Sequence, residues 1–395
     1  MKSTNDDVII FIPGFYGSHL KLKTGDKRVW LTAKNALING RSLAFDEHEM
    51  EIPAVQKYQV DGVFKSVDFI PGIFKIDVYG EVIQQLKERS GLTVIALDYD
   101  WRQDNYLTVK KLDELVNQLK SEKQSRKISI VAHSMGGLIT SYYLRYGIQS
   151  PITAKENWAG ADKIDKVVMA GVPFRGVVSV LRNMQNGVKF GLNTSLVNHQ
   201  AIASFESSYQ TLFLDQDKIL NNQLKPLNNI HNIQTWQQHQ WGLLKNHNNV
   251  SDSAMKNRVA FVQKQLQTSR QFLNLINAKG SEKINNPLLY VSSDSQPTLG
   301  KMVVYQEENE TRLIHQDVEF KKIFPHQKMS LMVSGDGTVS STSGVVPDAY
   351  QVAFNSMSLV KTKVEHSKLY HDAEVMRRVL EFLKSREEHE IISRS

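Results

Sequence analysis

The chain has 395 residues, of which 48 are basic and 41 acidic, so its formal net charge is +7. It contains no cysteine, which excludes disulfides, thiolate metal sites, iron–sulfur clusters and a cysteine nucleophile. No apolar run approaches the ~20 residues that a membrane-spanning helix needs. The basic residues are scattered, which is not the pattern of a nucleic-acid-binding protein, although a modest positive balance suits anionic partners such as lipid headgroups.

The N-terminus is polar and acidic and leads into only a five-residue apolar stretch, so no signal peptide is visible. We therefore expect a soluble, cytoplasmic protein whose charge is compatible with transient, peripheral contact at a membrane surface. No metal or nucleotide motif stands out and glycine-rich phosphate loops are absent, so no cofactor is expected. The oligomeric state is left open by the sequence.

Short β-rich runs alternate with helical patterns in the first part of the chain, which is typical of a mostly parallel sheet covered on both faces. The patterns predict strands over 8–12, 93–97, 128–132 and 166–170. Between these strands they predict a helix from a cap at Asp77 to Gly91, a helix over 107–119, and a third directly after Gly136-Gly137. The sequence therefore begins as an α/β protein.

After about residue 177 the alternation stops, and Asn and Gln become frequent up to residue 279. Apolar residues nevertheless recur at helical spacing after Ser251, a candidate cap, which favours a folded helical insert over a low-complexity segment. Strand patterns return at 288–291, 329–333 and 353–359, and a last helix follows Asp372. We predict one α/β domain with core segments 1–176 and 285–395, interrupted by a helical lid over 177–284.

The strongest motif is Ala132-His133-Ser134-Met135-Gly136-Gly137, which lies where a predicted strand gives way to a helix. A serine on such a sharp turn projects its hydroxyl above the sheet edge, and small neighbours leave room for the chain reversal. The usual pattern is G-x-S-x-G, and Ala132 replaces its first glycine. We interpret Ser134 as a nucleophile, with an ordinary turn serine as the alternative.

A serine hydroxyl needs a base and an orienting carboxylate, which in the α/β-hydrolase fold follow in the order Ser, Asp, His. Asp336 follows the predicted strand at 329–333 and is the candidate acid, although an aspartate between two glycines also fits a simple turn. His366 and His371 both lie between the last strand and the last helix. We prefer His366 as the base, because His371 directly precedes the helix cap.

Negative charge that develops on the attacked carbonyl oxygen needs fixed hydrogen-bond donors. The backbone N–H of Met135, directly after the nucleophile, is the first candidate. The loop after the first strand contains Gly14 and Gly17, which allow its backbone to approach a substrate closely. The N–H of Phe15 in this loop is the second candidate, and a plain β-to-α turn is the alternative.

These motifs, in this order, resemble the lecithin:cholesterol acyltransferase family. Beyond the serine elbow, the matching pieces are Pro13-Gly14-x-x-Gly17-Ser18, Asp98-Tyr99-Asp100-Trp101-Arg102, Gly171-Val172-Pro173-Phe174-Arg175-Gly176 and Gly335-Asp336-Gly337-Thr338-Val339. The resemblance implies an α/β-hydrolase fold and a triad of Ser134, Asp336 and His366, with Phe15 as an oxyanion donor. We interpret the 98–102 string as structural, with Arg102 pairing a carboxylate and Trp101 packing near the pocket rim.

The resemblance also implies hydrolysis or transfer of fatty acyl esters taken from a lipid. We therefore predict a serine-dependent acyl hydrolase or O-acyltransferase that acts on a phospholipid-type substrate through an acyl-enzyme. Two alternatives stay open: a carboxylesterase or thioesterase for soluble esters, and a non-catalytic lipid- or partner-binding protein on a hydrolase scaffold. The expected partner is a lipid or another acyl ester, and no nucleic acid is expected. The headgroup, the acyl position and the acyl acceptor are left open.

Overall fold

The computed structural model describes residues 6–38, 41–52, 56–70, 74–227, 229–245, 250–280, 282–307 and 310–385. Its centre is a six-stranded sheet in the order β18-β13-β9-β8-β1-β7, in which the neighbouring strands pair in parallel. The strands are β1 (Val8–Ile12), β7 (Thr93–Ala96), β8 (Ile128–His133), β9 (Lys166–Ala170), β13 (Ile284–Ser293) and β18 (Phe354–Thr362). Five of these strands lie where the sequence predicts a strand. Their observed ends differ from the predicted ends by at most two residues, except for the end of β18, which differs by three. Strand β13 extends beyond its predicted range in both directions.

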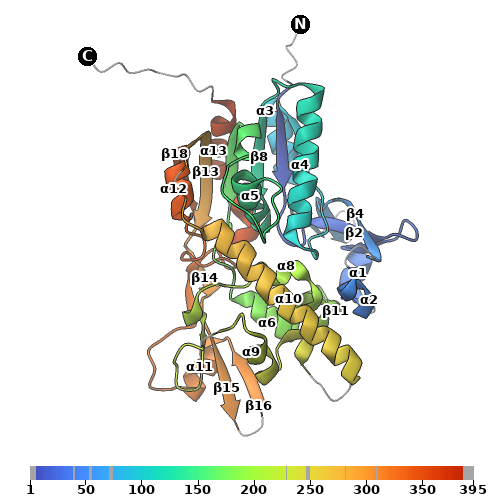
Figure 1. The fold of residues 1–395 in the computed structure, drawn as a ribbon, viewed down its shortest axis with the longest axis vertical. Coiled ribbons are helices and arrows are strands. Elements are labelled where there is room, and N and C mark those ends of the chain that lie inside the picture. The colour runs from blue at the N-terminus through green and yellow to red at the C-terminus, as the bar shows by residue number, and fades with distance from the viewer. Residues whose placement is uncertain are drawn as a thin grey trace.

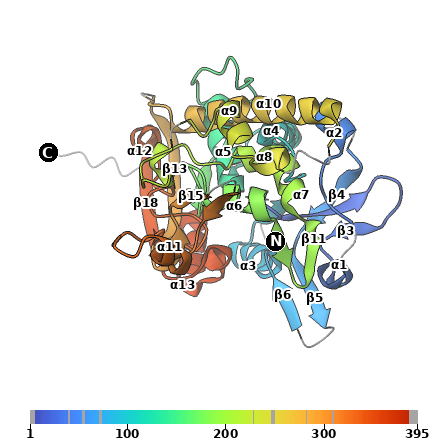
Figure 2. The same ribbon diagram turned by 90° about the horizontal axis from the view of Figure 1, so that it is seen from below.

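Helices cover both faces of this sheet, because successive side chains of a strand point to opposite faces. The four helices are α3 (Gly80–Ser90), α4 (Asn105–Glu122), α5 (Met135–Tyr146) and α13 (Ala373–Lys384). In β1, Ile9 and Phe11 belong to the core beneath α3 and α13, whereas Ile10 and Ile12 belong to the core beneath α4 and α5. Figure 2 shows these two pairs of helices on opposite sides of the sheet. The predicted α/β-hydrolase fold is confirmed.

A second layer lies below the sheet in Figure 1, at the carboxyl ends of its strands. Between β9 and β13 its main elements are α6 (Ser179–Asn186), β10 (Val188–Phe190), β11 (Asn193–Val197), α7 (His199–Ser204), α8 (Glu206–Tyr209), β12 (Ile219–Leu220), α9 (Ile233–Gln238) and α10 (Asp252–Asn277). The long helix α10 runs diagonally across Figure 1. The Ser251 hydroxyl caps it by accepting the Ala254 N–H, as the sequence predicts. The hairpin of β10 and β11 has no counterpart in the prediction.

Smaller elements that do not belong to the central sheet follow two of its strands, β1 and β13. After β1 they are β2 (Ser18–Leu22), β3 (Arg28–Trp30), α1 (Ala33–Leu37), α2 (Glu47–Glu51), β4 (Tyr58–Val63), β5 (Ser66–Ile70) and β6 (Phe74–Asp77). After β13 they are β14 (Gln296–Leu299), β15 (Met302–Glu307), β16 (Glu310–Ile314), α11 (Asp317–Ile323), β17 (Met332–Gly335) and α12 (Asp348–Ala353). Strand β12 pairs with β15, so the segment after β13 shares a sheet with the predicted lid.

The structure corrects the sequence prediction at two elements. Asp77 does not cap α3, because it pairs with Ser66 at the end of the β5–β6 hairpin, and Tyr79 takes the capping position instead. The strand predicted at 329–333 forms over Met332–Gly335 and pairs antiparallel with β14, outside the central sheet. In both cases pairing with another strand, and not the local sequence pattern, determines where the element begins or ends. None of the described helices combines the length and the apolar character that crossing a membrane requires.

Candidate active site

Ser134 lies on the turn between β8 and α5. Its backbone angles, φ 55° and ψ −123°, are ones that a residue with a side chain rarely adopts, at a cost of about 1–3 kcal/mol. Two hydrogen bonds hold the turn: the Ser134 N–H donates to the Ala170 carbonyl at 2.8 Å, and the Gly137 N–H donates to the Ser134 carbonyl at 2.8 Å. This conformation is the one expected of a serine whose hydroxyl stands clear of the sheet edge.

Small residues permit close backbone contacts around this turn. A Cβ atom on Gly136 would lie 2.4 Å from a carbonyl oxygen of β1, and one on Gly14 would lie 2.8 Å from the Cβ of Ser134. Ala132, in place of the usual first glycine, is completely buried in β8, and its carbonyl accepts the Tyr370 hydroxyl at 2.8 Å. An alanine therefore fits at this position.

His366 lies between Ser134 and Asp336. Its Nε2 atom is 2.9 Å from the Ser134 Oγ, and its Nδ1 atom is 2.7 Å from the Asp336 Oδ2. His366 begins a 3₁₀ turn (His366–His371) after β18, and its N–H donates to the Asp336 carbonyl at 2.8 Å. The structure thus brings together three residues singled out from the sequence. Of the two candidate histidines, His366 contacts the serine, and His371 ends the turn beside the cap of α13.

The Asp336 carboxylate is buried, with 2% of the residue exposed. Burial by itself raises the pKa of Asp336, but the His366 imidazole and the N–H groups of Thr338 and Val339 lower it below the ordinary value. These two N–H groups donate to Oδ1 at 2.9 and 2.7 Å, which leaves Oδ2 for His366. The ionised carboxylate favours the imidazole tautomer with a proton on Nδ1, so that Nε2 can accept the proton of Ser134.

The two predicted oxyanion donors are backbone N–H groups near Ser134. Met135 is the first residue of α5, so its N–H has no acceptor within the helix. Phe15 lines the same cavity as Ser134. Within the described ranges, neither N–H donates to another group of the protein. Both groups therefore have the capacity to bind an oxygen of a ligand.

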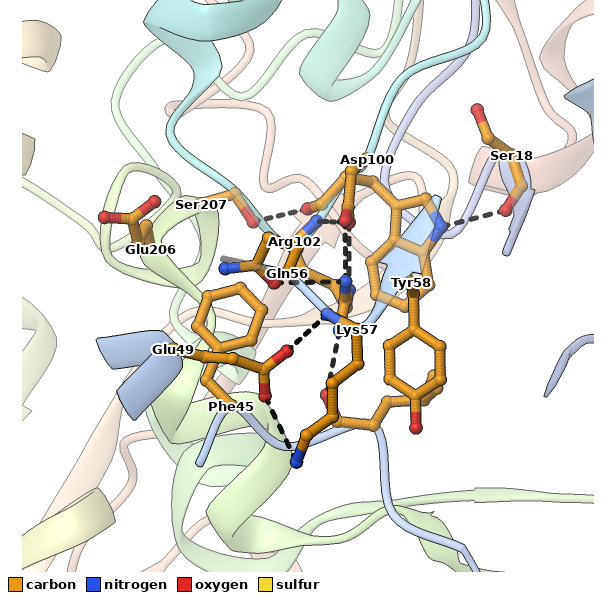
Figure 3. A network of polar contacts seen from close by, with 12 residues as sticks. Ser18, Phe45, Glu49, Gln56, Lys57, Tyr58, Asp100, Arg102, Glu206 and Ser207 are labelled. Carbon is orange, nitrogen blue, oxygen red and sulfur yellow. Dashed lines mark hydrogen bonds and ion pairs between the residues drawn. The ribbon is translucent and has the colours of Figure 1, made fainter. Parts of the chain in front are cut away.

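The loop that carries Phe15 is held at both ends by the 98–102 segment. The Tyr99 hydroxyl donates to the Pro13 carbonyl at 2.7 Å, and the Trp101 indole N–H donates to the Ser18 carbonyl at 3.0 Å, the latter bond being drawn in Figure 3. The rings of Phe15 and Trp101 also pack together, with their centroids 5.3 Å apart. The segment thereby fixes the position of the loop.

Arg102 holds the 98–102 segment in place through contacts in the protein interior. It is completely buried, and its Nη2 atom pairs with the Asp100 Oδ2 at 2.6 Å (Figure 3). Its guanidinium also lies over the rings of Phe45 and Tyr58, 5.0 and 4.8 Å from their centroids. The pairing with a carboxylate and the packing of the neighbouring Trp101 agree with the structural role that we inferred from the sequence.

Two further residues belong to the surroundings of the site. The Nδ1 atom of the buried His133 lies 2.8 Å from the Tyr79 hydroxyl, and its Nε2 atom lies 3.0 Å from the His366 carbonyl. The Tyr79 oxygen also accepts the Gly14 N–H at 3.0 Å. Burial lowers the pKa of His133 to about 3, so the ring is neutral at physiological pH. In the sequence, only the position of His133 next to Ser134 indicates that it belongs to the site. No sequence pattern indicates that Tyr79 does.

A cavity of about 710 Å³ lies over Ser134 and His366, between the core and the second layer. Its volume falls in the range of small-molecule sites. Much of its wall is apolar or aromatic, with contributions from Phe15, Tyr16, Trp30, Phe64, Phe190 and Met332. Over the ranges that the structure describes, no group of three or more His, Asp or Glu side chains is arranged to hold a metal ion.

Comparisons with known proteins agree with this fold. The family model described as lecithin:cholesterol acyltransferase matches residues 21–391. An uncharacterized protein of Saccharomyces cerevisiae is 29% identical over 143 residues, which cover 35% of this chain and 20% of the relative. A protein of Arabidopsis thaliana described as lecithin-cholesterol acyltransferase-like 4 is 28% identical over 132 residues, which cover 31% of this chain and 22% of the relative. These matches span about a fifth of the relatives' own length.

Among solved structures, a chain of the Tle4–Tli4 complex superposes with a TM-score of 0.59 and 13% sequence identity. The match covers 97% of this chain and 98% of that one, and at this identity it shows the fold alone. The family model, by contrast, spans nearly the whole sequence, including the serine elbow, Asp336 and His366. This chain therefore belongs to the lecithin:cholesterol acyltransferase family.

Proposed function

We propose that the protein is a serine-dependent lipid acyl hydrolase or O-acyltransferase that acts on fatty acyl esters through an acyl-enzyme. Membership of the family supports lipid acyl hydrolysis or transfer in general terms. The observation that carries the finer proposal is the hydrogen-bonded row from Asp336 through His366 to Ser134, with spacings of 2.7 and 2.9 Å. This row ends in a largely apolar cavity, which suits an acyl chain.

In the proposed first half-reaction, the Ser134 Oγ attacks the ester carbonyl carbon while the His366 Nε2 takes the hydroxyl proton. Asp336 stabilises the imidazolium that forms. The N–H groups of Met135 and Phe15 bind the oxyanion of the tetrahedral intermediate. When this intermediate collapses, His366 returns the proton to the leaving alcohol, and the acyl group stays on Ser134.

In the second half-reaction, water or an alcohol attacks the acyl group while His366 takes its proton. A free acid or a new ester then leaves, and Ser134 regains its proton. Which acceptor wins depends on how far the closed site excludes water. We propose that residues 177–284 act as the lid that controls this, between core segments 1–176 and 285–395. Four residues of this segment line the cavity, which supports the proposal: Ser179, Arg182, Asn183 and Phe190.

A fluorophosphonate probe tests the nucleophile directly, because it reacts with activated serines. We expect the wild-type protein to be labelled and Ser134→Ala to be unlabelled, and a label that persists in the variant would contradict the assignment. For the base, His366→Ala should abolish turnover of an ester, whereas the matched variant His371→Ala should keep most of it. The reverse result would move the role of the base to His371.

A series of p-nitrophenyl esters with increasing acyl chain length tests the substrate class. We expect kcat/KM to rise with chain length, because each added methylene buries apolar area in the cavity. A preference for short chains would instead favour a soluble ester as the substrate. Repeating the series with an added long-chain alcohol separates the two reactions, since only a transferase forms a new ester from it.

A further inference from the structure

Strand β18 is the outermost strand on one side of the central sheet (Figure 1). Within the described residues it pairs with β13 alone, so the backbone N–H and C=O groups on its other side point away from the sheet. The pairing with β13 is regular from Ser356 to Thr362, without a bulge. Strand β7, at the opposite edge, has four residues, whereas β18 has nine. The longer open edge of the sheet is therefore at β18.

The sequence of β18 carries little protection against pairing with another chain. Proteins commonly protect an open edge with charged side chains, with proline or with a bulge. Strand β18 contains neither proline nor glycine, and Lys361 is its one charged residue. The Lys361 ammonium pairs with the Asp294 carboxylate at 2.7 Å, so its charge is already matched within its own chain.

Apolar side chains are exposed beside this edge. Leu359, in the middle of the strand, is 60% exposed, and Val345 is 53% exposed. Both residues line a cavity of about 270 Å³ together with Met357, so the three side chains form one patch on the same face of the sheet. An exposed apolar patch next to unpaired backbone groups indicates a surface that another chain covers.

We propose that a second copy of this chain covers it, with the two β18 strands antiparallel around a two-fold axis at Ser358. Such a dimer needs a strand that is complementary to its own reverse. Around Ser358, Met357 of each copy lies opposite Leu359 of the other, which brings four apolar side chains together on the face with the exposed patch. Asn355 lies opposite Lys361, so no like charges meet.

Neighbouring registers fit less well. The axis must pass through a residue if both copies are to keep the same faces in one continuous sheet, because side chains alternate between the faces. Centred on Met357, the axis would place Leu359 opposite Asn355. Centred on Leu359, it would place Met357 opposite Lys361. The side chains therefore favour Ser358 as the centre.

Pairing through β18 leaves both proposed active sites open. None of the described residues that line the cavity over Ser134 belongs to β18. The dimer therefore does not depend on the proposed function, and labelling of Ser134 by a fluorophosphonate has no bearing on it.

The absence of cysteine from the chain makes the register testable with single-cysteine variants of the full-length protein. In Ser358→Cys the two thiols lie directly opposite each other, where Cβ atoms of cross-strand neighbours are about 4.5–5.5 Å apart and a disulfide can form after a small adjustment. Ser356→Cys is the matched control, because Ser356 is exposed like Ser358 and lies on the same face. Its two thiols would be four residues apart along the paired strands, or ~14 Å. Under mild oxidation, non-reducing gel electrophoresis should show a linked dimer for Ser358→Cys and monomer for Ser356→Cys.

Sedimentation equilibrium measures the association itself. We expect the wild-type protein to dimerise, and Leu359→Lys to raise the dissociation constant of the dimer by ~100-fold or more, because two leucines lose their apolar contacts. Leu192→Lys is the matched control, since Leu192 is 73% exposed in the turn between β10 and β11, and it should leave the constant unchanged. Circular dichroism verifies that each variant is folded.

Three results would overturn the inference. A wild-type protein that stays monomeric would leave the edge to an extended peptide of another protein. A dimer that Leu359→Lys does not weaken would show that the copies meet on another surface. Equal cross-linking of the two cysteine variants would show that the strands do not pair around Ser358.

Discussion

The hydroxyl of Tyr79 lies 2.8 Å from the Nδ1 atom of His133 and links two loops that flank the serine elbow. The Tyr79 oxygen accepts the Gly14 N–H at 3.0 Å, and the His133 Nε2 faces the His366 carbonyl at 3.0 Å. Since His133 is neutral, its Nε2–H donates to that carbonyl and its Nδ1 accepts the tyrosine proton. One hydrogen-bonded row therefore runs from the proposed oxyanion loop to the loop of the proposed base.

Replacing Tyr79 with phenylalanine should impair both folding and the proposed reaction. The change leaves the Gly14 N–H and the His133 Nδ1 buried without partners, and each such loss costs about 1–3 kcal/mol. If half of this total raises the barrier of the reaction, kcat/KM for an ester falls by roughly 5- to 150-fold. Steady-state kinetics and the midpoint of urea unfolding measure the two effects.

Tyr350→Phe is the control for this prediction. Tyr350 is also buried and donates to a backbone carbonyl, that of Ser141 at 3.2 Å, but it does not line the cavity. It loses one hydrogen bond where Tyr79→Phe loses two, so it should lose some stability and keep its kcat/KM. Equal losses of kcat/KM in both variants would show that Tyr79 contributes only to stability.

The buried His133 also makes stability depend on pH. In the folded protein its pKa is lowered to about 3, whereas its ordinary value is 6.5. Between these values the unfolded chain binds one more proton at this site, so the free energy of unfolding decreases as the pH falls through this window. The largest slope from one such group is about 1.4 kcal/mol per pH unit.

Urea unfolding of the wild-type protein and of His133→Gln, at several pH values from 7 to 4, tests this dependence. The difference between the two proteins isolates His133 from the other histidines, and the variant should show the flatter profile. Parallel profiles would mean that His133 takes up a proton in the folded protein as readily as in the unfolded chain. Asp336, whose pKa is lowered, contributes in the same direction but only below its ordinary value of 3.8.

Arg102→Met should destabilise the protein severely. The substitution leaves the Asp100 carboxylate buried without its cation, and removing one partner of a buried pair costs about 3–5 kcal/mol. Arg102→Lys keeps the charge but loses the bidentate contact with Asp100, so an intermediate loss is expected. Denaturant unfolding at pH 7 measures both, with Arg377→Gln as an exposed control that should change by at most about 1 kcal/mol. A small effect of Arg102→Met would mean that the segment is not anchored here.

The parts of the fold that were predictable from the sequence are those that local patterns determine. β1 and β9 were predicted with their observed ends, because each is a short apolar run bounded by turn residues. The Ser134 turn was predictable for the same reason, since strand, turn and helix are continuous in the chain. The chain order Ser, Asp, His then limited the candidates for the acid and the base to residues after Ser134, which led to Asp336 and His366.

Contacts that depend on distant pairing were not predictable in this way. The ends of β17 follow from its partner β14, and the end of β6 at Asp77 follows from Ser66 across a hairpin. Tyr79 reaches a histidine 54 residues further along the chain, and no spacing rule connects them. Arg182 was one of many basic residues in the sequence, and only the structure shows that it lines the cavity.

Gly14→Ala should reduce the proposed activity with a smaller effect on folding. An added Cβ would lie 2.8 Å from the Cβ and 3.3 Å from the Oγ of Ser134, so the loop with the Phe15 N–H would have to move away from the serine. Losing one oxyanion donor lowers kcat by ~10²–10³-fold in serine hydrolases. Gly344→Ala is the control, because its Cβ would approach no atom closer than 3.3 Å, and this neighbour is the Tyr290 hydroxyl. Steady-state kinetics compares the two variants. If Gly14→Ala keeps the kcat of the wild-type protein, the 13–18 loop does not supply the second donor, and a donor must be sought elsewhere in the cavity.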